Sequence, residues 1–142
     1  MANYYSACRT NYFKVKDAEE FLKVMETIPN IEVIHEPEGA KYAGKFVILG
    51  DDPDGGDWPC YSYDQDTGEE TEIDITKIIS EHLIDGEVAI FMDAGAEKLR
   101  YVAGSAFAIN NKGESKSLRL WDIYDMAREL TDRPKDVTLA EY

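Results

Sequence analysis

Apolar residues recur at helical spacing in three segments of the chain, residues 17–28, 75–83 and 122–130. Asp17 and Asp122 stand at the starts of the first and third segments, where a side-chain oxygen can cap a helix. The apolar members of the three stripes are Ala18, Phe21, Leu22, Met25 and Ile28, then Ile75, Ile78, Ile79, His82 and Leu83, and finally Ile123, Met126, Ala127 and Leu130. The spacing predicts three α-helices, and we expect Phe21, Leu22 and Met25 to be buried.

Alternation of apolar and polar residues, or a short apolar run, predicts the strands. They are expected at residues 12–16, 31–35, 42–48, 58–63, 70–75, 87–92, 99–109 and 117–120. Gly104 interrupts the longest of these strands and indicates a bulge. Residues 64–68 read as a hairpin turn, with Gly68 suited to a positive φ. Because hairpin-linked strands dominate, the sequence predicts one α+β domain over residues 1–142, with a mainly antiparallel sheet and three helices.

Composition limits the classes of protein that this chain can be. With 142 residues, of which 44% are apolar, it can bury a hydrophobic core and is too apolar for a disordered acidic chain. It has no apolar run of about 18 residues, so we expect no membrane span. The start at residues 1–5 lacks the features of a signal peptide, and Cys8 and Cys60 form no metal or disulfide motif. We therefore expect a reduced, cytoplasmic protein.

Negative charge is concentrated in one part of the chain. The formal net charge is -14, and residues 51–97 hold 15 acidic residues against a single base, Lys77. The rest of the chain has 14 acids and 14 bases. Such a chain is a poor direct binder of nucleic acid or of an anionic membrane, because both carry negative charge themselves.

The acidic region is the candidate binding surface. Like charges placed so closely destabilise a fold, which favours a use in binding a basic partner over a solvated face alone. Trp58 is the aromatic residue that we expect to anchor an interface. In the predicted strand, Glu70, Glu72 and Asp74 alternate with apolar residues and should form one solvent-facing row. The candidate partner-binding residues are Asp51, Asp52, Asp54, Asp57, Trp58, Asp64, Asp66, Glu69, Glu70, Glu72 and Asp74.

The sequence provides no motif for catalysis, a metal or a cofactor. His35 and His82 both lie among apolar neighbours, as core or boundary histidines do, so we expect no catalytic residue and no enzyme activity. The loop 51–57 is rich in Asp and Gly, but an EF-hand that began at Asp52 would need Glu where Tyr63 stands. An irregular cation or small-ligand site in this loop remains an alternative. A second alternative is an accessory protein-interaction module that has no link to nucleic acid.

Several short segments resemble small acidic accessory proteins of phages and other mobile elements, of the antirestriction and anti-CRISPR type. The segments are residues 3–5, 9–17, 86–89, 95–101 and 140–142. The resemblance implies an inhibitor of a host nuclease, acting in the bacterial cytoplasm and binding a basic, nucleic-acid-binding host protein or complex by imitating DNA. It supplies no catalytic residue and no cofactor. The oligomeric state stays open, a dimer included.

Overall fold

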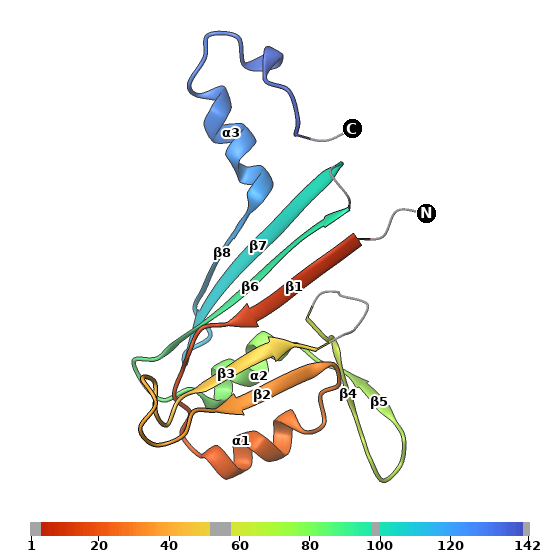
Figure 1. Cartoon of the computed structure of the whole chain (residues 1–142), viewed down its shortest axis with the longest axis vertical. Helices are drawn as coiled ribbons and strands as arrows, with labels where there is room; N and C mark the ends of the chain where they lie inside the picture. The colour runs from red at the N-terminus through yellow and green to blue at the C-terminus, as the bar shows by residue number, and fades with distance from the viewer. Residues whose placement is uncertain (1–3, 52–57, 98–99, 141–142) are drawn as a thin grey trace.

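A six-stranded antiparallel sheet forms the body of the protein, in the order β2-β3-β1-β6-β7-β8 (Figure 1). The computed structural model describes residues 4–51, 58–97 and 100–140. The strands are β1 (Tyr4–Thr10), β2 (Ile31–His35), β3 (Phe46–Gly50), β6 (Val88–Glu97), β7 (Tyr101–Asn110) and β8 (Ser115–Arg119). A separate hairpin pairs β4 (Tyr61–Tyr63) with β5 (Glu70–Glu72). The helices are α1 (Ala18–Met25), α2 (Ile75–His82) and α3 (Ile123–Arg128), with 3₁₀ turns η1 (Leu120–Asp122) and η2 (Pro134–Asp136). The α+β prediction is confirmed.

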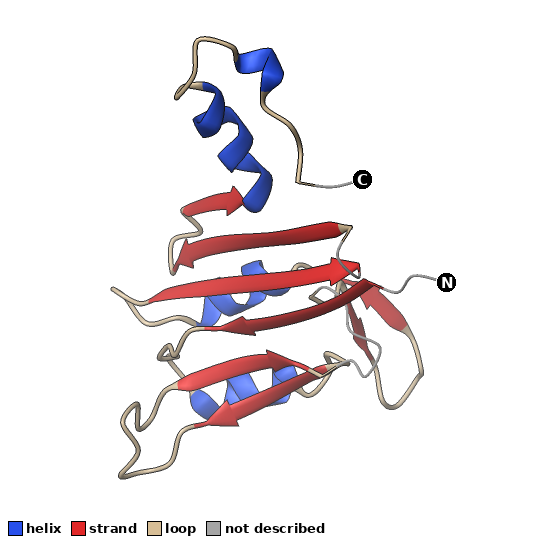
Figure 2. Cartoon of the chain, turned by 45° about the horizontal axis from the view of Figure 1, so that its top comes forward, coloured by secondary structure: helices blue, strands red, loops and turns tan. Residues whose placement is uncertain are grey.

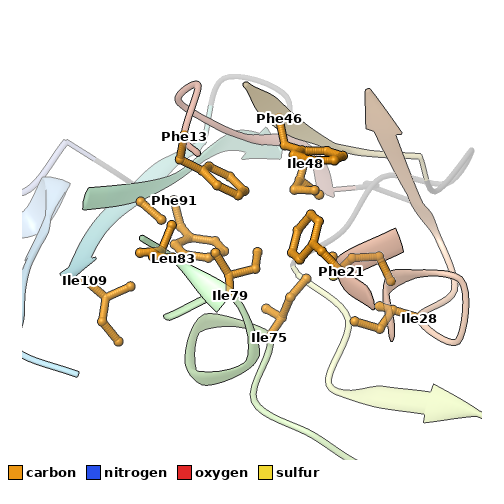
Figure 3. Packing of buried hydrophobic residues seen from close by; sticks show 12 residues of the cluster. Phe13, Phe21, Ile28, Phe46, Ile48, Ile75, Ile79, Leu83, Phe91 and Ile109 are labelled. Atoms are coloured by element: carbon orange, nitrogen blue, oxygen red, sulfur yellow. The ribbon is translucent and has the colours of Figure 1, made fainter. Parts of the chain in front are cut away.

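The helices α1 and α2 cover the same face of the sheet, and the hydrophobic core lies between these two layers (Figures 2 and 3). Asp17 caps α1 as predicted, because its carboxylate accepts a hydrogen bond of 3.2 Å from the backbone N–H of Glu20. Phe21 is fully buried and meets the rings of Phe13 and Phe46 edge to face, with centroids 6.0 and 4.9 Å apart. Met25 is buried, as expected, and Leu22 is partly buried beside the same core. No helix in the described ranges is long and apolar enough to cross a membrane.

The first strand lies earlier in the chain than the sequence predicts. Residues 4–10 form β1, which pairs with β6 from Tyr4 opposite Glu97 to Thr10 opposite Phe91. The predicted strand at 12–16 is wrong, because it makes only isolated bridges, from Phe13 to Phe46 and from Val15 to Leu83. These two side chains point inward as the pattern suggests, but their backbone partners lie on two different elements, so no ladder forms.

Gly104 marks a close approach and no bulge. The ladder between β6 and β7 runs without interruption through the pair Ala94 and Gly104. A Cβ atom at this position would lie 3.1 Å from the carbonyl oxygen of Asp93 and 3.3 Å from the side chain of Leu120. Glycine therefore lets Leu120 settle onto β7, and this contact fixes where the chain leaves β8 for η1.

The C-terminal segment stands apart from the two-layer core. In Figure 1, α3 extends beyond β8, at the opposite end of the molecule from α1 and the β4–β5 hairpin. None of its residues is buried. Asp122 was predicted to cap this helix with its side chain. Its carboxylate instead accepts a hydrogen bond of 2.8 Å from the backbone N–H of Arg119 at the start of η1, and η1 runs directly into α3.

Candidate binding surface

The β4–β5 hairpin carries acidic side chains on one exposed face. Glu70 pairs with Tyr63 and Glu72 pairs with Tyr61 across the two antiparallel strands. Directly opposed residues point to the same side, so these two carboxylates and two tyrosines share a face. Alternate residues on a strand lie roughly 6.6 Å apart, which sets the spacing of the two carboxylates. Residues 70–72 are all exposed.

The turn of the hairpin is held by local hydrogen bonds. The Asp64 carboxylate accepts from the backbone N–H groups of Asp66, at 2.8 Å, and Thr67, at 3.2 Å. Gly68 has a φ of 75° as predicted, and its N–H donates to the Asp64 carbonyl at 2.8 Å. Asp64 therefore shapes the turn, whereas the side chains of Asp66 and Glu69 are exposed close to its tip.

The hairpin is anchored to the rest of the fold near both of its ends. At the turn end of β4, the backbone N–H of Tyr63 donates to the Thr27 carbonyl, just after α1, at 2.6 Å. The N–H of Ile73 donates to the Cys60 carbonyl at 2.8 Å, and the Ile73 side chain packs against the core. The hairpin is thus presented in a defined direction, which lowers the entropy cost of binding through it.

Asp74 does not belong to the acidic row. Strand β5 ends at Glu72, and Asp74 is the N-cap of α2. Its carboxylate accepts from the backbone N–H groups of Thr76 and Lys77 at 3.0 and 3.4 Å, and from the Thr76 hydroxyl. The predicted row of three carboxylates is therefore a row of two, Glu70 and Glu72, because the third acid closes the next helix.

Trp58 occupies the margin of the core. Its ring meets Phe91 edge to face, with centroids 5.3 Å apart, and it is only partly exposed. We expected Trp58 to anchor an interface; because its indole covers Phe91, only part of the ring is open to a partner. Tyr63 is the more open aromatic residue of the region, at 44% exposure. Its position beside Glu70 makes it the better anchor, and its alternation with Tyr61 is the sequence signal for that role.

Of the loop at 51–57, the structure describes only Asp51. Asp51 is exposed and its backbone N–H donates to the Asn30 carbonyl at 2.9 Å. Asp52, Asp54 and Asp57, which were predicted to bind a partner, lie outside the described residues. Within the described ranges, no group of His, Cys, Asp or Glu side chains is arranged to hold a metal ion.

Charge on the described part of this region is unbalanced. Residues 58–74 contain six acids and no base. Among the described residues, none of these six carboxylates lies within 4.0 Å of a Lys, Arg or His nitrogen. We call the exposed side chains Tyr63, Asp66, Glu69, Glu70 and Glu72 the acidic hairpin surface. Its chemistry suits a partner that supplies several positive charges and can stack on a tyrosine ring.

Both histidines are ring partners of phenylalanines. His35 stacks on Phe46 with centroids 4.1 Å apart, and His82 meets Phe21 edge to face at 5.5 Å. These contacts agree with the boundary role that the sequence suggests. Comparison with known proteins adds no further guide: no family model, no curated protein and no solved structure matches the chain.

Proposed function

We propose that this chain is a non-enzymatic binding protein whose acidic hairpin surface occupies a basic groove on a nucleic-acid-binding protein of a bacterial defence system. Binding there excludes the nucleic acid, so the chain acts as an inhibitor by DNA mimicry. One observation carries the proposal: an anchored hairpin presents carboxylates and tyrosines on one face, and no described Lys, Arg or His nitrogen lies within 4.0 Å of these carboxylates. The resemblance to acidic anti-defence proteins of mobile elements points the same way.

The spacing of charge supports mimicry over a general acidic patch. Strand geometry places the Cα atoms of Glu70 and Glu72 roughly 6.6 Å apart, of the order of the spacing between neighbouring phosphates on one DNA strand. Asp66 and Glu69 extend the negative charge toward the tip of the hairpin. A groove lined with Lys and Arg to receive phosphates would gain charge-assisted hydrogen bonds from such carboxylates.

The test uses a pair of charge reversals that leave the caps intact. Glu70→Lys with Glu72→Lys changes two exposed strand residues and spares Asp64 and Asp74. The matched control is Glu32→Lys with Glu38→Lys, which makes the same change in net charge at two exposed acids outside the hairpin. Wild type and both variants are immobilised and used to capture proteins from a nuclease-treated bacterial lysate.

The captured protein is then bound to labelled duplex DNA, and each chain is added in increasing amount while fluorescence anisotropy is followed. We expect wild type and the control pair to displace the DNA, and the hairpin pair to lose both capture and displacement. Equal behaviour of the hairpin pair and wild type would contradict the proposal. A captured partner that binds no nucleic acid would contradict mimicry and support the accessory-module alternative.

A further inference from the structure

The segment that follows β8 exposes a stripe of large apolar side chains. Ile123, Met126 and Leu130 are exposed by 56%, 59% and 89%. Ile123 and Met126 lie on one side of α3, and Leu130, in the turn after the helix, continues their spacing of three and then four residues, as in helices that pack against each other. Leu118, Leu120 and Trp121 continue the stripe toward β8, with exposures of 49% to 59%. We call these six side chains the β8–α3 surface.

The helix at the centre of this surface has little support from its own chain beyond one hydrogen bond of 2.8 Å, which the backbone N–H of Ala140 donates to the Tyr124 hydroxyl. α3 spans six residues and buries none of them. Isolated helices shorter than about 12 residues are marginal in water, and most helices in proteins are stabilised by packing of an apolar face. Its one local ion pair, between Arg128 and Asp125 at 3.0 Å, is exposed and adds little. A surface that covers the apolar stripe would supply the missing packing.

The area of the surface fits a protein interface. A fully exposed large apolar side chain presents roughly 100 to 200 Å², so six that are about half exposed present on the order of 500 Å². That is near the upper limit for apolar patches on a monomer. With a polar rim it approaches the ~800 Å² per partner of a standard interface.

The charge around the surface favours a second copy of the chain. The chain carries a net charge of -14, but residues 112–136 contain six acids and six bases. Two copies can therefore approach through this segment with little net repulsion. Exposed Lys116 and Arg119 lie on β8, and exposed Glu129 directly follows α3, whereas Asp125 is already paired with Arg128 within α3. In a two-fold contact, the bases of one copy can face the acids of the other.

We propose that the β8–α3 surface is a self-association interface, in which two copies pack their α3 stripes and β8 edges together about a two-fold axis. β8 is the last strand of the sheet, and no described strand pairs with its outer side. A hollow of about 670 Å³ over β6 and β7, lined by Asp93 and Gly104 and, from the segment after β8, by Trp121 and Ile123, gives the partner's side chains a place to enter. Since the acidic hairpin lies at the other end of the molecule, the dimer would present two hairpins.

Light scattering on the full chain after size exclusion tests the proposal without any variant. We expect twice the 16.1 kDa of one chain, with the dimer populated at concentrations of about 1 to 100 μM. A wild type that elutes as a 16.1 kDa monomer throughout this range would overturn the proposal.

Met126→Glu with Leu130→Glu tests the location of the interface. Neither side chain is buried in a single chain, so we expect the fold to survive and the dissociation constant to rise at least about 100-fold. Val88→Glu is the control, because Val88 is 43% exposed at the far end of β6, and it should remain a dimer. If circular dichroism shows that the Glu pair unfolds, Met126→Gln with Leu130→Gln replaces it, with an expected rise of at least about tenfold. A folded pair that dimerises like wild type would overturn the assigned surface.

Discussion

Replacing Asp74 with alanine should cost stability because it removes the cap of α2. The carboxylate accepts hydrogen bonds from the backbone N–H groups of Thr76 and Lys77, two donors that have no partner within the helix. Loss of such a cap typically costs about 1 kcal/mol, within a range of about 0.5 to 2. The helix carries Ile75 and Ile79 into the core, so the loss should appear in global unfolding.

Urea denaturation followed by circular dichroism measures this effect. We expect the free energy of unfolding of Asp74→Ala to fall by about 1 kcal/mol. The melting temperature should fall by about 3 to 5 °C, given the size of the chain. Asp74→Ser is the control for charge, because serine keeps a capping oxygen and removes the carboxylate. Its loss should be clearly smaller. Equal losses for serine and alanine would refute the capping role and return Asp74 to the acidic row.

Two further predictions concern the core and the close approach at β7. Phe21→Ala should destabilise the fold by about 3 to 5 kcal/mol, measured by the same urea titration, because loss of a fully buried ring with three aromatic neighbours leaves a cavity. A loss under about 1 kcal/mol would contradict the packing in Figure 3. Gly104→Val should lower the free energy of unfolding by about 1 to 3 kcal/mol, because even its Cβ atom would press on the Asp93 carbonyl and on the Leu120 side chain. An unchanged melting curve would show that β7 has more room at this position than the 3.1 and 3.3 Å distances indicate.

The two core helices were predictable because their signals are local. A stripe at 3.6-residue spacing acts within one segment, and so does the predicted cap of α1, Asp17. Both helices appear within a few residues of the expected bounds. The first strand was missed for a physical reason. Its inward positions Ser6, Cys8 and Thr10 are small or polar, so no apolar alternation marks it. Thr10 is nevertheless buried, and its hydroxyl accepts the backbone N–H of Ile48 at 2.9 Å.

The candidate surface was predictable in charge but only partly in geometry. Counting acids locates the hairpin, and strand alternation places Glu70 and Glu72 on one face. Composition does not reveal that Asp64 and Asp74 use their carboxylates to bind nearby backbone N–H groups. It also does not reveal that Trp58 is held by Phe91, because that contact joins residues far apart in the chain.

The salt dependence of association tests the central claim most directly. The association rate of the chain with its captured partner is measured between about 0.05 and 0.5 M salt. Over this range the Debye length, which sets the reach of electrostatic attraction, shortens several-fold. If the acidic hairpin surface drives binding, the rate for wild type and for the Glu32 and Glu38 control pair should fall at least tenfold, a rough expectation for steered association. The rate for Glu70→Lys with Glu72→Lys should start low and change little. Parallel salt dependences for all three chains would contradict the account, because the hairpin carboxylates would then have no part in recognition.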